Sequence, residues 1–503
     1  MSSAPALRVP SRLPIRAVLV LLALAAAATA LVPTAGAATV ATSEVQSCGI
    51  FSGSVRCWGQ DTSGALGFVT DSSAVPYATP VGAPIKGATH VVGTWTGGGG
   101  SGHFCAVAGG AAWCWGPNGY GTAGTGTKER ELPVPVAVPT LTSGVTLIDK
   151  NASRACGIVN GGAWCWGNAY LGNNTKADSA VPVAVSGMGS GVTDVAAGWR
   201  SSCVLQSGTV SCFGDGIHGQ LGGGKGSRTP DGAVGLPGAA TAIDAGVDSA
   251  CAVVNGGVWC WGSNGDGRLG IGDAKAKGGA TPVNVVGLPA GAGAVDIAGN
   301  TNHYCVLMAN GSVRCWGSNA NGGVGNGATT GNVPAPAVVP LPGPASSVAV
   351  GRSHTCATVG ANFYCWGSNS GGQLGGGTIG GMSGTPVKVL LPPKATVNGV
   401  AKPIKVNGSR TVTIGTVACP IGTGTCTVAL PTRVTVKLKR VAYKLSITKL
   451  TTVAPGTTGQ IVATVPMGLY KKLAGKRARV SARVVATNHG GRLVKSAVAT
   501  IKR

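Results

Sequence analysis

The chain has 503 residues, too many for one small domain, and a formal net charge of +24. Its 86 glycines, with only 5% aromatic and 11% charged residues, are a loop-rich β composition and argue against a mainly helical protein. Sixteen cysteines in evenly spaced pairs predict an oxidising compartment.

Residues 1–37 have the three parts of an export signal. Three arginines precede an apolar run over residues 17–31, and Ala35-Gly36-Ala37 is a cleavage site, so we expect the mature chain to begin at Ala38. The alternative is a retained membrane anchor, which the shortness of the apolar run disfavours. We therefore expect a secreted, extracellular protein.

The charge is unevenly distributed along the chain. Residues 394–503 contain 20 Lys and Arg and no Asp or Glu, whereas residues 38–393 are almost neutral. This asymmetry predicts that the C-terminal part meets an anionic partner.

From residue 38 to residue 393 one unit repeats every 47 to 57 residues, and its fixed feature is a hairpin closed by two cysteines. In the fifth unit two apolar strands flank Asn255-Gly256, a pair typical of a type I′ turn. Pairing outward from that turn places Cys251 opposite Cys260, at a Cα separation of roughly 4.5 Å that a disulfide tolerates.

Seven such hairpins follow one another, six with a cysteine spacing of nine and one with ten. The extra residue, around Asn310-Gly311, fits a three-residue turn with glycine in the left-handed region. The predicted bonds are Cys48–Cys57, Cys105–Cys114, Cys156–Cys165, Cys203–Cys212, Cys251–Cys260, Cys305–Cys315 and Cys356–Cys365.

Each unit holds about four short strands. An apolar strand precedes the hairpin, a Gly-rich loop such as 263–270 follows it, and a strand such as Thr281-Pro-Val-Asn-Val285 closes the unit. A single unit cannot bury its own apolar faces, so neighbouring units must stack. A period near 50 residues with four strands predicts a β-propeller, here with seven blades over residues 38–393.

The motifs Cys-Trp-Gly-x-Asn-x-x-Gly-Gln-Leu-Gly after the hairpin and Gly-x-x-His-Thr-Cys-Ala before it resemble the regulator of chromosome condensation repeat. The match is good in units five to seven and weaker elsewhere; Phe213 replaces the Trp of unit four. The resemblance implies a seven-bladed propeller. Eukaryotic members act as nucleotide-exchange factors or chromatin binders, roles that the cysteine pairs and export signal disfavour. Secreted bacterial relatives include a β-lactamase-inhibitor propeller, which implies a protein-binding ring.

Several recurring residues are expected to be structural. One Trp follows six of the hairpins at a fixed place, which indicates packing between blades. His103, His303 and His354 each stand two residues before a hairpin cysteine and are also expected in the core, whereas His218 lies in a blade loop and is the one His with a surface role.

After residue 393 the pattern changes to alternating strands, as in Arg477-Ala-Arg-Val-Ser-Ala-Arg-Val-Val485. We expect a small immunoglobulin-like β-sandwich over residues 394–503. Cys419 and Cys426 should form an eighth disulfide, because their spacing of seven and the lack of nearby His do not fit a zinc site. We expect a monomer with no metal and no cofactor.

Catalytic motifs are absent from the sequence: it contains no His-Glu-x-x-His, Gly-x-Ser-x-Gly or phosphate-binding Gly-rich loop. The carboxylates are scattered singly, and the spacing from unit to unit suggests no acid–base pair. We therefore predict a non-catalytic protein, although a site assembled from several blades would escape a single sequence.

The predicted function is binding. Loop residues that break the repeat are candidate contacts for an extracellular protein or glycan: Trp95, Tyr120, Tyr170, Trp199 and His218. A second group of cations is expected to attach the chain to anionic wall polymers or lipid head groups of the cell envelope, with no specific nucleic acid: Lys437, Lys439, Arg440, Lys471, Lys472, Lys476, Arg477 and Arg479. The alternatives are a secreted inhibitor of an extracellular enzyme and a glycan-active enzyme.

Overall fold

The computed structural model describes residues 39–503, except for 69–72, 82–84, 96–101, 224–225, 231, 400–403, 407–408, 421–425, 432, 439–440, 448–449, 451, 474–475, 489–490 and 503. The predicted export signal therefore lies outside the described residues. Within the described residues, no helix has the length and apolar character needed to cross a membrane.

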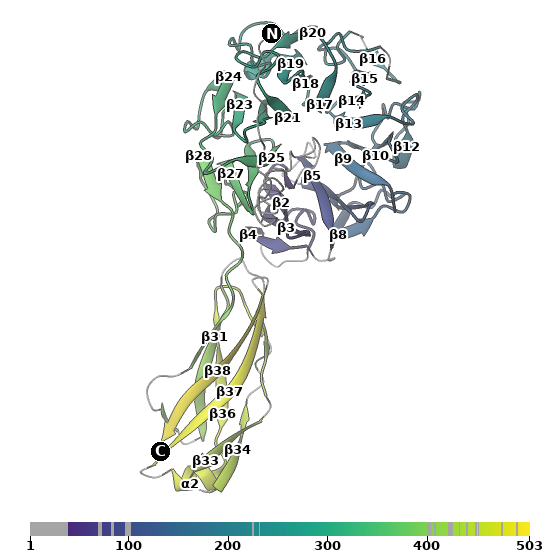
Figure 1. The fold of residues 1–503 in the computed structure, drawn as a ribbon. Coiled ribbons are helices and arrows are strands. Elements are labelled where there is room, and N and C mark those ends of the chain that lie inside the picture. Colours follow the sequence, from purple (N-terminus) through teal and green to yellow (C-terminus); the bar gives the residue numbers. More distant parts are fainter. Residues whose placement is uncertain are drawn as a thin grey trace, which may run out of the picture. The chain divides into compact units, whose positions relative to one another are not determined.

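Seven four-stranded antiparallel sheets, called sheets 1 to 7 in chain order, follow one another around a ring (Figure 1). Each contains four consecutive strands, as the sequence predicts, and the first strand of each lies innermost. The strands are β1 (Val40–Thr42), β2 (Gln46–Phe51), β3 (Ser54–Gln60), β4 (Ala74–Pro80); β5 (Ala88–Trp95), β6 (Gly102–Ala108), β7 (Ala111–Pro117), β8 (Glu131–Ala137); β9 (Val145–Asn151), β10 (Arg154–Val159), β11 (Gly162–Gly167), β12 (Ser179–Ala184); β13 (Val192–Ala197), β14 (Ser201–Gln206), β15 (Thr209–Asp215), β16 (Gly226–Ser227); β17 (Ala240–Ala245), β18 (Ser249–Val254), β19 (Gly257–Gly262), β20 (Gly279–Asn284); β21 (Ala294–Gly299), β22 (His303–Met308), β23 (Val313–Ser318), β24 (Asn332–Val338); β25 (Ala345–Val350), β26 (His354–Val359), β27 (Asn362–Ser368) and β28 (Met382–Lys388). A 3-10 turn, η1 (Gly265–Gly267), follows β19.

The disulfide-closed hairpin is confirmed in every sheet. Asn255 and Gly256 have φ of 51° and 70°, as a type I′ turn requires, and Cys251 pairs with Cys260 at a Cα separation of 4.1 Å. The ten-residue hairpin keeps the same cysteine register, because its extra residue is taken up in a turn where Gly311 has φ 77°. All seven predicted hairpin bonds are present.

A buried Trp ties neighbouring sheets together in six places. Each indole N–H donates to a backbone carbonyl in the loop of the preceding sheet, at 2.8–3.1 Å. The pairs are Trp58 to Gln373, Trp115 to Ala65, Trp166 to Thr122, Trp261 to Gln220, Trp316 to Arg268 and Trp366 to Gly323. The Trp58 bond joins sheet 1 to sheet 7, and Val40 and Phe363 share a buried cluster across the same seam. The ring therefore closes by packing between two complete sheets.

Phe213 takes the Trp position in sheet 4 and has no N–H to donate. The equivalent carbonyl, that of Tyr170, instead accepts a long hydrogen bond of 3.5 Å from Arg154 Nη1. Arg154 is 3% exposed and belongs to sheet 3, as Tyr170 does, so this carbonyl is bonded within its own sheet and not by the next one.

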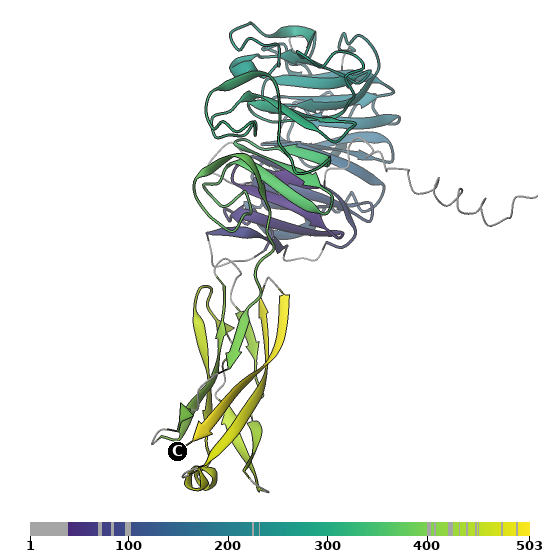
Figure 2. The ribbon, with the colours of Figure 1, turned by 60° about the vertical axis from the view of Figure 1, so that its left-hand side comes forward.

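Residues 396–502 form two five-stranded sheets that enclose one apolar core (Figure 2). The first has the order β29 (Thr396–Gly399), β31 (Thr411–Ala418), β36 (Thr458–Thr464), β34 (Val441–Ile447) and β33 (Arg433–Leu438). The second has the order β30 (Ile404–Lys405), β38 (Gly491–Lys502), β37 (Arg477–Asn488), β32 (Cys426–Ala429) and β35 (Thr452–Val453). A short helix, α2 (Met467–Lys472), follows β36. The predicted Cys419–Cys426 bond joins the end of β31 to the start of β32, and so links the two sheets.

Candidate functional site

One edge of the ring, called the loop face here, carries all five residues that the sequence singles out for partner binding. The strands of each sheet are antiparallel, so the loop between its first and second strands and the loop between its third and fourth strands lie on the same face of the ring. The cysteine hairpins, which join the second and third strands, turn on the opposite face. Trp95 and Trp199 belong to connections of the first kind, and Tyr120, Tyr170 and His218 to the second.

These five residues are not equally available. Tyr120 is 48% exposed and His218 is exposed, whereas Tyr170 and Trp199 are half-buried. Lys176 Nζ lies 5.6 Å from the centre of the Tyr170 ring. The Trp95 backbone ends β5, and its side chain lies outside the described residues. His218 and Tyr120 are therefore the two that present themselves to a partner most openly.

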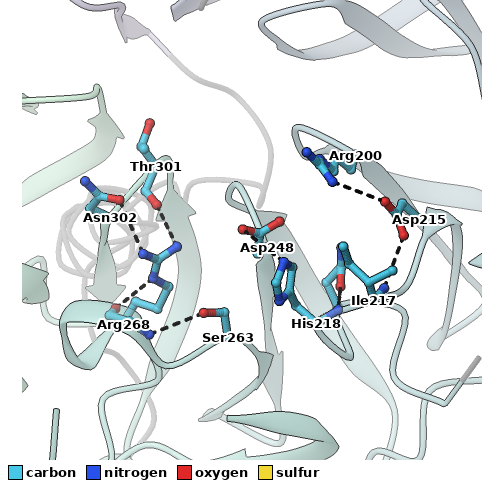
Figure 3. A network of polar contacts seen from close by, with 11 residues as sticks. Arg200, Asp215, Ile217, His218, Asp248, Ser263, Arg268, Thr301 and Asn302 are labelled. Carbon is cyan, nitrogen blue, oxygen red and sulfur yellow. Dashed lines mark hydrogen bonds and ion pairs between the residues drawn. The ribbon is translucent and has the colours of Figure 1, made fainter. Parts of the chain in front are cut away.

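A polar network holds the His218 loop (Figure 3). The His218 amide donates to Gln220 Oε1 at 2.9 Å, and the Ile217 amide donates to Asp215 Oδ1 at 3.2 Å. His218 Nε2 lies 3.9 Å from Asp248 Oδ2, on the neighbouring sheet. The loop is thus fixed at its backbone, while the Ile217 side chain is left 64% exposed.

The adjoining loop of sheet 5 is anchored by Arg268, which is 8% exposed. Its Nε donates to the Gly265 carbonyl at 2.8 Å and its Nη1 to the Thr301 carbonyl at 3.0 Å, with Asn302 nearby (Figure 3). Because Thr301 belongs to sheet 6, this side chain joins two sheets on the loop face.

Between the His218 loop and the sheet 5 loop lies an open depression of about 640 Å³. Its lining combines an apolar side chain, Ile217, with His218, Ser263 and Lys277. The Ser263 hydroxyl accepts the Gly265 amide at 3.3 Å, and no hydrogen bond joins it to His218 in the described network. An imidazole, a cation and an exposed aliphatic group around a wide hollow suit contact with another surface better than nucleophilic catalysis.

A second feature, the inner collar, was missed by the sequence reasoning. Among the described strands, the first strand of each sheet has no neighbour on its inner edge. Across six of the seven seams, a polar side chain in or directly after a first strand bonds to the first strand of the adjacent sheet or to the residue before it. The collar residues and their partners are His90 with the Ile148 carbonyl, Asp149 with the Ala197 amide, Asp194 with the Ile243 amide, Asp244 with the Gly299 amide, Asn300 with the Val350 carbonyl, and Ser347 with the Thr39 hydroxyl.

The collar surrounds a central cavity of about 120 Å³ lined by all seven first strands. Burial raises the pKa of Asp149, and also that of Asp296, to about 6. Burial raises the pKa values of Asp194 and Asp244 well above the ordinary range, and the neighbouring carboxylates act in the same direction. Three of the four carboxylates each accept a hydrogen bond from a backbone amide of the next sheet. These three side chains therefore join neighbouring sheets.

The expectation that the carboxylates are scattered singly was therefore wrong. A signal existed: Asp149 and Asp244 each stand seven residues before the first hairpin cysteine, and Asp194 and Asp296 each stand nine before it. Aligning the units on that cysteine places both pairs at inward positions. No group of three or more His, Cys, Asp or Glu among the described residues could hold a metal ion.

Two basic side chains of the ring are buried without a hydrogen-bond partner. Lys150, which lines the cavity, is 4% exposed, and burial lowers its pKa well below the ordinary value. His103 is 1% exposed, and neither ring nitrogen is bonded. In the other two His-bearing seams, His303 Nε2 lies 2.8 Å from the Thr355 hydroxyl and His354 Nε2 lies 2.8 Å from the Ser47 hydroxyl. At the corresponding place before Cys156 the chain has Ala155.

The cations predicted to bind an anionic surface are placed as follows. Lys471 and Lys472 lie on α2, Lys476 precedes β37, and Arg477 and Arg479 lie on β37; all five are exposed. Lys437 lies in β33 and its side chain lies outside the described residues, as do Lys439 and Arg440 entirely. These cations thus lie on several separate elements. On β37 they alternate regularly with buried residues.

Comparison with known proteins supports the repeat assignment. Models of the regulator of chromosome condensation (RCC1) repeat match residues 255–307 and 310–358, and a related model matches 294–322. No curated protein matches the chain. Among solved structures, Prp20p from Saccharomyces cerevisiae, described with its binding to Gsp1p and histones, has a TM-score of 0.58 and 21% identity over 67% of this chain and 85% of its own. Human WBSCR16 has a TM-score of 0.54 and 21% identity over 68% and 96%. At this identity the likeness shows the fold.

Proposed function

We propose that this chain, which carries repeats of the regulator of chromosome condensation family, is an exported, non-catalytic binding protein that uses its loop face to hold an extracellular protein. In this proposal the seven sheets are seven propeller blades over residues 38–393. Residues 394–503 are a separate sandwich domain that attaches to the anionic cell envelope, and residues 1–37 direct export. Eight intramolecular disulfides support an oxidising destination.

The observation that carries the proposal is the depression between the His218 loop and the sheet 5 loop. The depression has a volume of about 640 Å³ and is open to solvent. Ile217 lines it and is 64% exposed. An exposed aliphatic side chain beside an imidazole, a hydroxyl and a cation is typical of a protein contact. The backbone bonds of Ile217 and His218 and the Arg268 anchors hold this surface in shape before a partner arrives, which lowers the ordering cost of binding.

Two further facts support the same conclusion. The collar carboxylates are occupied by backbone amides, so they are poorly placed for acid–base chemistry. Prp20p, which is similar in fold, is described as binding Gsp1p and histones, and a yeast RCC1 (Prp20) structure is of a complex with Kap60. A ring of this kind can thus serve as a protein-binding surface.

Site-specific photo-crosslinking tests the loop-face proposal. A photoreactive residue at position 217, introduced into the full chain in the cells that make it, should capture one defined protein. The same residue at Asn310, which is exposed at the β22–β23 turn on the opposite face, is the matched control. Capture at position 217 and not at 310 is expected; equal capture at both positions, or none at 217, contradicts a loop-face partner.

A further inference from the structure

The outer surface of β37 is a regular row of arginines. Along this strand exposed and buried residues alternate without exception from Arg477 to Val484. The buried positions are small or aliphatic, and the exposed ones are Arg477, Arg479, Ser481 and Arg483. Arg483 was not among the cations singled out from the sequence, although its alternation with buried residues marks the same face.

The surroundings of this row leave its charge uncompensated. On the paired strand β38, Arg477 faces Lys502, Arg479 faces Thr500 and Arg483 faces Ser496. Residues 394–503 contain no Asp or Glu at all, so no acidic side chain of this part of the chain can neutralise the row. A solvated strand face ordinarily mixes both signs of charge.

We infer that the outer face of β37 is a binding track for a linear polymer of phosphodiester groups lying along the strand. Residues two apart on a strand are roughly 6.6–6.8 Å apart, so the row offers guanidinium groups at one and then two such intervals, with the Ser481 hydroxyl between. A planar guanidinium matches a phosphate with two parallel hydrogen bonds, which a lysine cannot do. The inference rests on the proposed attachment to the anionic envelope and names the surface and the ligand class.

The same strand argues against a nucleic acid as the natural ligand. Single-stranded nucleic acid is held by aromatic rings on which its bases stack. Residues 394–503 contain two aromatic residues, Tyr443 and Tyr470, and neither lies in β37 or β38. The row therefore recognises phosphates without a place for bases.

The test measures binding of the full mature chain to synthetic poly(glycerol phosphate), by fluorescence anisotropy across a range of salt concentrations. The triple variant R477Q/R479Q/R483Q should bind at least tenfold more weakly. The slope of log affinity against log salt should also fall by about 2, since each phosphate contact on a flexible chain contributes about 0.7. The matched control K394Q/R433Q/K444Q removes three exposed charges that lie outside β37 and outside the cations singled out for the anionic surface, and it should lose less than threefold.

A conservative variant tests the guanidinium geometry. R477K/R479K/R483K keeps the charge and should bind severalfold more weakly than the natural protein; unchanged binding would overturn the phosphodiester assignment. Equal losses in the two glutamine triples would mean that net charge alone acts, and would overturn the track. Preference for an oligonucleotide of equal charge would overturn the choice of polymer. If the natural protein binds no polyanion, the envelope attachment itself fails, which is a distinct result.

Discussion

At the scale of single residues, a buried His before the hairpin cysteine forms a hydrogen bond between sheets only where the facing residue of the next sheet has a hydroxyl group. His303 and His354 each meet a hydroxyl of the next sheet at 2.8 Å, from Thr355 and Ser47. His103 occupies the same place before its cysteine, but the next sheet has Ala155 there. Its two ring nitrogens consequently have no partner.

Substituting Ala155→Ser should supply the missing hydroxyl. A buried hydrogen bond contributes roughly 0.5–1.5 kcal/mol to stability, so the variant should unfold at a higher temperature than the natural protein. Ala250→Ser is the matched control, because the sheet before it has Ser201, not His, at the facing position. The measurement is differential scanning calorimetry; a gain in both variants or in neither contradicts the assignment.

The carboxylates that line the central cavity predict that the stability of the chain depends on pH. Asp296 has a pKa of about 6 in the folded chain, above its value of about 3.9 when unfolded, so the folded state binds more protons between these pH values. The free energy of unfolding should therefore fall as pH rises from 4 to 6. The pKa of Asp194 is also raised, by burial and by the nearby Asp296 carboxylate, so Asp194 should make the free energy of unfolding fall with rising pH as well.

The variant Asp296→Asn should flatten part of this fall, as followed by thermal unfolding at several pH values. The surface variant Asp178→Asn should leave the slope unchanged, since Asp178 is exposed, where it contacts Lys128 and the Ala169 amide. A titration of the Asp296 carboxyl near pH 4 by nuclear magnetic resonance would show that burial does not raise its pKa.

At the scale of elements, the hairpins could be predicted from the sequence because every determinant is local. Turn residues, strand alternation and cysteine spacing all lie within about a dozen positions, and together they fix the register. The inner collar could not be predicted, because most of its hydrogen bonds join residues about 50 positions apart and depend on how two sheets meet.

The two Trp residues of β19 allow the contribution of a hydrogen bond to stability to be distinguished from that of side-chain volume. Trp261 is fully buried and donates to the Gln220 carbonyl at 3.0 Å, whereas Trp259 is half-buried and its Nε1 has no partner. Trp261→Phe should destabilise the chain by roughly 2–4 kcal/mol through the lost bond and the smaller ring. Trp259→Phe should change stability by less than about 1 kcal/mol. Equal effects on the melting temperature would contradict the role given to the indole N–H.

Loop residues mark the limit of sequence reasoning about the site. Tyr170 and Trp199 break the repeat just as His218 does, yet they are half-buried: the Tyr170 carbonyl accepts a hydrogen bond from Arg154, and the Trp199 amide donates to the Gly246 carbonyl of the next sheet. Ile217, the most exposed large apolar side chain described, belongs to no sequence motif. Its position beside a depression depends on how two loops meet in the folded chain. Exposure of a loop residue depends on tertiary packing, which the residue types do not encode.

At the scale of the whole molecule, we propose two binding surfaces of opposite character. The loop face mixes charges of both signs around an apolar group, which suits one specific protein partner. The outer face of β37 carries one sign only, which suits a repeating anionic polymer. Fixed on the envelope by the second surface, the ring would hold its partner at the cell boundary.

The most direct test of this account is sedimentation of the full mature chain with purified envelopes of the cells that produce it. We predict that the protein pellets at low salt, is released as salt rises, and stays in solution when R477Q/R479Q/R483Q is present. Pelleting that is insensitive to both salt and the triple substitution would show that the cationic face is not the attachment surface, and would contradict the central claim.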